Sequence, residues 1–183
     1  MLNIMTDLLG RKNPYAQVVH GVYASALSFS RSPKFYQEYS VPDTLDGRFD
    51  LLLLTVFLVM QRMLDEQTEG SRKVAKKFNQ ALFDETFKDM DQTLREMGIG
   101  DMGVPKHMRK MMRAFNGRMH AYENAITTAT LKDALIKNLY GTIEAPDESS
   151  VVKMEQKIYE VLECLKAQKI EDLLAGRIEF EKE

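Results

Sequence analysis

Residues 51–60 of this 183-residue chain read LLLLTVFLVM, and this run decides the fold. Asp50 precedes the run and Gln61 and Arg62 follow it, so it is far shorter than the roughly 20 residues that a membrane-spanning helix needs. A helix with this sequence is apolar on most sides and must be covered by other helices. We therefore predict a core helix that contains the run and extends to about Leu64.

The helical spacing of apolar residues continues on both sides of the run. No segment shows a convincing alternation of apolar and polar residues of the kind that predicts a strand. The expected helices cover 15–29, 33–39, the stretch that ends at about 64, 71–97, 105–126, 130–141 and 146–169, before a short amphipathic tail. Thr130 with Asp133 resembles a capping box. The prediction is an all-α fold, a single compact bundle of about seven helices over residues 1–183.

Composition and charge exclude several classes of function. The formal charge of −2 gives no global basicity, so DNA is not an expected partner. The single cysteine, Cys164, rules out an intramolecular disulfide and is expected to be a small buried hydrophobe. The start lacks the features of a signal or transit peptide, which leaves residues 1–13 as either a flexible or a membrane-touching N-terminus.

No recognisable motif for catalysis, metal or cofactor binding is present. Gly98, Gly100 and Gly103 have the spacing of a dinucleotide fingerprint, but a helix rather than a strand precedes them. We interpret these glycines as a turn between two helices. The carboxylates of the preceding helix are spread around it, and two are expected to form i,i+4 pairs: Asp84–Lys88 and Asp91–Arg95. Nothing in the sequence recommends catalysis or a cofactor, and an enzyme of unrecognised type, with a catalytic triad assembled across the fold, stays an alternative at this point.

The helix expected after Gly103 has two chemically different faces. Its apolar residues fall within one arc of about 100°, and its basic residues lie on the opposite arc, with no acidic residue between Asp101 and Glu123. The candidate client-binding residues are Met108, Met111, Met112, Phe115 and Met119. The candidate basic surface is Lys106, Arg109, Lys110 and Arg113.

Three interpretations of this helix remain open. The methionines can pack into the core while the cations are solvated. Alternatively, the unbranched methionines can adapt to varied apolar helices of a partner. In the third interpretation, the basic face contacts anionic lipid or RNA phosphate.

Several short sequence strings, which we call phrases, lie between residues 14 and 140. They are PKFY (33–36), VPDTLDGRFD (41–50), FLV (57–59), FKDMD (87–91), LREMGIGD (94–101), GVPK (103–106), and AFNGR (114–118) with AY (121–122), and LIKNLY (135–140) is a weaker match. In these phrases the chain resembles the ubiquinol–cytochrome c chaperone family, whose members assist assembly of respiratory complex III. The C-terminal helix and tail, 146–183, match only loosely, and Thr55 stands where the family often has histidine.

The resemblance implies a non-enzymatic assembly factor that binds newly made cytochrome b through an apolar and basic helical surface. It implies a cytoplasmic protein, peripheral at the inner face of the bacterial inner membrane, or on the matrix side in a mitochondrion. The ribosome and a second assembly factor are further partners that it suggests. The alternative is an RNA- or ribosome-binding helical module that uses the basic face of the 104–126 helix.

Some residues of these phrases are expected to shape the fold rather than to contact a client. Gly47 is expected to permit close approach of a helix, Arg48 to pair with a buried or half-buried carboxylate, and Asp101 to cap the helix that begins near Val104. The full set is Asp46, Gly47, Arg48, Gly98, Gly100, Asp101, Pro105, Gly117 and Arg118.

Overall fold

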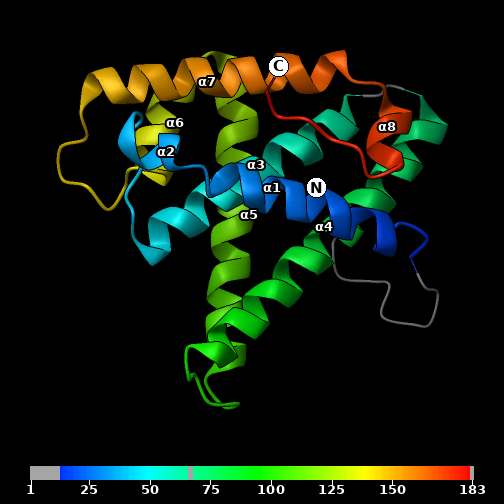
Figure 1. The fold of residues 1–183 in the computed structure, drawn as a ribbon, viewed down its shortest axis with the longest axis horizontal. Helices are drawn as coiled ribbons and strands as arrows, with labels where there is room; N and C mark the ends of the chain where they lie inside the picture. Colours follow the sequence, from blue (N-terminus) through cyan, green and yellow to red (C-terminus); the bar gives the residue numbers. More distant parts are fainter. Residues whose placement is uncertain (1–12, 66–67, 182–183) are drawn as a thin grey trace.

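The computed structural model describes residues 13–65 and 68–181, so the expectation for residues 1–13 lies almost wholly outside the described part. In these ranges the chain is helical and contains no strand, which confirms the all-α prediction (Figure 1). The helices are α1 (Ala16–Ser30), α2 (Pro33–Gln37), α3 (Leu45–Leu64), α4 (Glu69–Glu96), α5 (Val104–Thr128), α6 (Leu131–Asn138), α7 (Glu148–Ala167) and α8 (Ile170–Leu174). No described helix is both long and apolar enough to cross a membrane.

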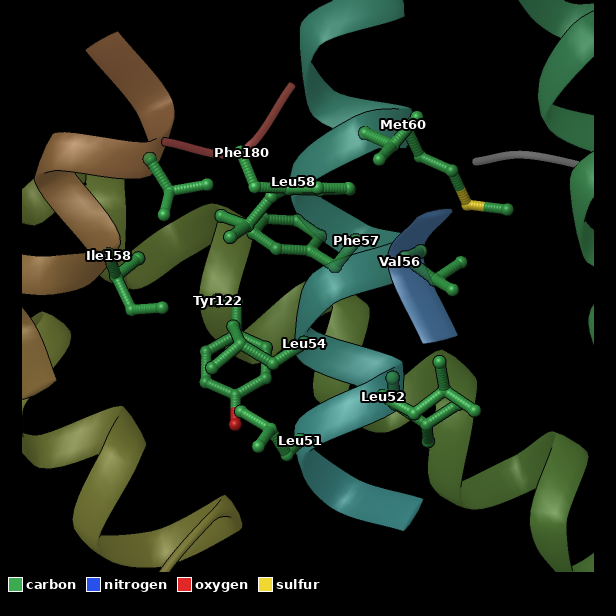
Figure 2. Packing of buried hydrophobic residues seen from close by; sticks show 14 of the residues in the cluster. Leu51, Leu52, Leu54, Val56, Phe57, Leu58, Met60, Tyr122, Ile158 and Phe180 are labelled. Carbon is green, nitrogen blue, oxygen red and sulfur yellow. The ribbon is translucent and has the colours of Figure 1, made fainter. Parts of the chain in front are cut away.

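The predicted core helix, α3, is the centre of the fold. Every residue from Leu51 to Met60 is buried, and α1, α4, α5 and α7 all pack against this helix. Figure 2 shows Tyr122 of α5 and Ile158 of α7 beside it. Thr55 satisfies its hydroxyl within the helix by donating to the Leu51 carbonyl oxygen at 2.9 Å. The prediction of a covered core helix is confirmed.

Side-chain caps begin several of the helices. The N-cap side chain accepts a hydrogen bond from a backbone N–H three residues on in α3 (Thr44), α4 (Thr68) and α7 (Asp147). The capping box predicted at Thr130 is wrong, because its hydroxyl is 2.8 Å from the Thr128 hydroxyl and makes no cap hydrogen bond. The helix that follows ends at Asn138 rather than at Gly141.

A buried ion pair joins α3 to α5. Asp50, which is only 5% exposed, lies 2.8 Å from Nη2 of Arg118. The prediction that Arg48 pairs with a buried or half-buried carboxylate is wrong, because Arg48 lies on the outside of α3 and binds the exposed Asp43 at 2.6 Å. Burial raises the pKa of Asp50 to about 6, although Arg118 acts to lower it.

Arg62 joins the other end of α3 to α7. Its Nε donates to the carbonyl oxygen of Leu165 at 2.9 Å, and its Nη2 donates to that of Gln168 at 3.0 Å. These carbonyls belong to the C-terminal end of α7, where a cation is favoured by the helix dipole. The central helix is thus held at one end by α5 and at the other by α7.

The hairpin formed by α4 and α5 extends away from α7, and its turn is the far end of the molecule in Figure 1. The turn occupies residues 97–103, and Gly98 has φ +81°, a conformation that favours glycine. This confirms the interpretation of the glycines as a turn between helices. Gly103 rather than Asp101 precedes α5, so the predicted cap at Asp101 is wrong; its carboxylate instead binds Arg95 of α4.

The acidic side of α4 matches the sequence expectation in part. Asp91 and Arg95 form the predicted i,i+4 pair at 2.6 Å. The pair predicted between Asp84 and Lys88 is wrong: the carboxylate of Asp84 accepts from Gln80, and the Lys88 ammonium faces Glu85 at 3.5 Å.

Gly47 and Gly117 have opposite surroundings. A Cβ at Gly47 would lie 2.1 Å from the carbonyl oxygen of Pro42, so close approach occurs, but to the loop before α3 rather than to another helix. A Cβ at Gly117, on the exposed face of α5, would meet nothing within 4 Å. The phrase residue Gly117 therefore has no packing role in this fold.

These surroundings predict opposite effects for one type of substitution. Gly47→Ala should lower the free energy of unfolding by about 2 kcal/mol, because the new methyl group overlaps the Pro42 carbonyl. Gly117→Ala should raise it by about 0.5–1 kcal/mol, since alanine loses less backbone entropy in a helix. Urea denaturation of both variants measures the two changes. Destabilisation by Gly117→Ala would contradict the open surroundings of that position.

The buried carboxylate predicts a pH-dependent stability difference. Between about pH 4 and 6 the folded chain binds a proton at Asp50 that the unfolded chain has released, because the folded pKa is the higher one. The contribution of Asp50 to the free energy of unfolding is therefore largest below pH 4 and declines up to pH 6. Asp50→Asn removes this decline, so the stability of the variant relative to the wild type should rise by about 2–3 kcal/mol between pH 4 and 6.

Urea denaturation across pH 4–7.5 measures this difference. Asp43→Asn is the matched control, because the pKa of the exposed Asp43 is lowered by its hydrogen bond from Arg48. Its relative stability should change little, and in the opposite direction. A flat profile for Asp50→Asn would contradict the assignment.

Candidate functional site

The structure places the candidate methionines of α5 at the edges of its buried seam. Met108, Met111, Met112 and Met119 are half-buried and pack against the core. Phe115 is only 2% exposed, with its ring centroid 5.3 Å from that of Phe83 and 5.6 Å from that of Phe87. Phe115 is therefore a core residue in this structure, whereas the four methionines each keep some exposed surface.

The angular positions around α5 explain this pattern. The buried residues Val104, Phe115 and Tyr122 lie at nearly one angle of the helix. On one side of them, Met108, Met112 and Met119 fall within about 40° of one another, and Met111 lies on the other side. We call these three residues the methionine strip. It runs along α5 between the buried seam and the solvent.

The predicted basic surface is exposed on the remaining side of α5. The side chains of Lys106, Arg109, Lys110 and Arg113 are exposed, and none has an ion-pair partner among the described residues. Two nearby acids, Asp91 of α4 and Asp101 of the turn, are both bound by Arg95, and Glu96 accepts a hydrogen bond from Gln92. The fold thus leaves four neighbouring cations available to an anionic partner.

The hairpin turn exposes two more methionines. Met102 is 96% exposed and Met97 is 53% exposed. Periodicity places Met97 on the apolar face of the helix expected over 71–97, but α4 ends at Glu96, and Met102 lies in the turn, where a helical wheel assigns no face. The signal that identifies them is an apolar side chain within a glycine-rich turn.

The other phrase residues occupy local structural positions. Asp46 lies in the first turn of α3 and Pro105 in the first turn of α5, while Gly98 and Gly100 lie in the hairpin turn. Arg118 is the partner of the buried Asp50. These placements agree with a role in the fold.

The histidines, the carboxylates and the single cysteine are the side chains to consider for metal binding or catalysis among the described residues. No group of three or more His, Cys, Asp or Glu among them is arranged to hold a metal ion. His107 and His120 are exposed on α5. Cys164 is buried as expected, with its Sγ 3.5 Å from the carbonyl oxygen of Glu179.

Comparison with known proteins places these features in a family. The sequence model described as ubiquinol–cytochrome C chaperone matches residues 37–180, which include α3, the hairpin and α7. The chain is also similar to the Cbp3 homolog from Brucella abortus, whose crystal structure gives a TM-score of 0.75 at 34% identity over 91% of this chain and 90% of that one. No curated protein gives a significant match. Since the family model covers most of the chain and the similar structure extends over nearly all of it, this protein belongs to the ubiquinol–cytochrome c chaperone family.

Proposed function

We propose that this protein assists the assembly of ubiquinol–cytochrome c reductase, respiratory complex III, as a chaperone without catalytic activity. The observation that carries the proposal is the family match over residues 37–180. It is supported by the similarity to the Cbp3 homolog from Brucella abortus over 91% of this chain.

The proposed client is newly made cytochrome b, the membrane-embedded haem subunit of that complex. Its apolar helices need a partner that accepts varied shapes before they meet their final neighbours. The methionine strip suits this task, since unbranched and polarizable thioethers repack around different apolar surfaces. Half-burial holds the inner part of each side chain against the core while leaving some of its surface for contact.

Such a client locates the protein at the inner face of the bacterial inner membrane, as a peripheral protein in contact with the cytoplasm. In a mitochondrion the equivalent place is the matrix side. The ribosome and a second assembly factor are compatible partners there, because a client of this kind is engaged soon after synthesis. The four exposed cations of α5 provide charge for contacts with either.

An RNA-binding role is the alternative use of the same basic surface. Proteins that hold single-stranded RNA usually add aromatic side chains on which bases stack. The Phe and Tyr side chains of α5, Phe115 and Tyr122, are both buried, the chain has no tryptophan, and the exposed rings of α5 are those of His107 and His120. The surface therefore offers phosphate contacts with little aromatic area for stacking, which favours the chaperone role.

Deletion of the gene should reduce the amount of complex III. Reduced-minus-oxidised spectra of membranes should show a weaker haem b signal, because cytochrome b that is not assembled is degraded. A plasmid copy of the gene should restore the signal, and succinate dehydrogenase activity in the same membranes serves as the control. Normal complex III levels in the deletion strain would exclude the proposed function.

The proposed client surface predicts site-specific cross-linking. A photoreactive residue at Met112, in the methionine strip, should cross-link to cytochrome b in growing cells. The matched control is Tyr159 on α7, which is also partly exposed, at 37%, but lies on another surface. Products are identified by mass spectrometry. Cross-linking to cytochrome b from Tyr159 but not from Met112 would assign the client to a different face.

A further inference from the structure

The turn of the α4–α5 hairpin carries the most exposed large apolar side chain of the described residues. Met102 is 96% exposed, Met97 is 53% exposed, and Ile99 between them is half-buried. Single apolar residues scattered over a surface are ordinary. Here two methionines share one turn at the far end of the molecule (Figure 1), and closing a glycine turn does not require either of them.

Positive charge is concentrated next to this turn. From Arg95 to Arg113 the chain has five Lys and Arg against two Asp and Glu, although the whole chain has a charge of −2. Asp101, the acid within the turn, is paired with Arg95. At 1.5 Å per residue, the cations from Lys106 to Arg113 lie within about 14 Å of the start of α5.

We infer that the hairpin tip, residues 97–103 with the cations Lys106, Arg109, Lys110 and Arg113, docks on an anionic phospholipid bilayer. Met97 and Met102 enter the boundary between headgroups and acyl chains, and the cations lie at the level of the lipid phosphates. The inference names the part of the fold that contacts the membrane. It rests on the proposed function only for the location of the protein at the membrane.

Two observations favour lipid over RNA as the partner of this tip. Exposed thioethers gain from transfer into an apolar acyl region, whereas RNA phosphates offer them nothing. The Phe and Tyr side chains of α5 are buried and cannot stack on bases. Docking by the tip also leaves α7 at the end of the fold away from the bilayer (Figure 1).

Flotation of the purified full-length protein with vesicles tests the inference. The wild type should bind vesicles of phosphatidylglycerol and phosphatidylcholine and should bind pure phosphatidylcholine vesicles at least about tenfold more weakly. Two variants each weaken binding to the anionic vesicles by about tenfold or more. One is Met97→Ser with Met102→Ser, and the other replaces Lys106, Arg109, Lys110 and Arg113 by glutamine.

The matched control replaces Arg72, Lys73, Lys76 and Lys77 by glutamine. These exposed residues lie in the first part of α4, and the replacement makes the same change in net charge about 30 Å from the tip. The control should retain wild-type vesicle binding. Circular dichroism and urea denaturation verify that all variants are folded.

Equal weakening of the control and tip variants, unchanged binding of both tip variants, or equal affinity for both kinds of vesicle would overturn the inference. So would binding to single-stranded RNA, steeply weakened by salt, with no binding to vesicles. The vesicle experiment contains no cytochrome b and measures lipid binding alone. The haem b spectra of the deletion strain measure the assembly of complex III. The proposed function and the lipid-docking inference can therefore fail independently of each other.

Discussion

Residues 51–60 of α3 are buried on every side, and this burial organises the other helices. A helical segment that exposes no polar face to water is stabilised by apolar contact in all directions, so helices from both halves of the chain must surround it. The two charged groups at its ends, Asp50 and Arg62, are then removed from solvent and need partners. Arg118 of α5 and the last carbonyls of α7 supply them. Such buried polar contacts contribute less to net stability than to fixing which surfaces meet.

The hairpin combines a fixed base with a free end. At its base the Phe115 ring of α5 packs edge to face against the rings of Phe83 and Phe87 of α4, which binds the two helices into the core. At its far end the turn carries Met97 and Met102 in solvent. The hairpin therefore provides both a rigid support for the methionine strip and an exposed apolar tip that suits insertion into a lipid bilayer.

Local sequence patterns predicted much of the fold. The apolar run identified the core helix, and the glycines and Pro105 located the hairpin turn, because these signals act within a few residues. The partner of Asp50 is Arg118, far along the chain, and no local pattern specifies how α5 is placed on α3. The same dependence explains the burial of Phe115, whereas Arg48 has a local partner, Asp43, only five residues away. The methionine strip was predictable as an apolar arc, but its half-burial is set by the neighbouring helices.

The contact between Arg62 and α7 has a consequence for synthesis of the chain. Arg62 and Leu165 are 103 residues apart, so the side of α3 that α7 covers has no partner until the C-terminal helix leaves the ribosome. At about 5–20 residues per second, that interval lasts roughly 5–20 s. During this time a run of leucines and valines is exposed to water and prone to self-association. A member of a chaperone family thus exposes, while nascent, the kind of apolar surface that general chaperones bind.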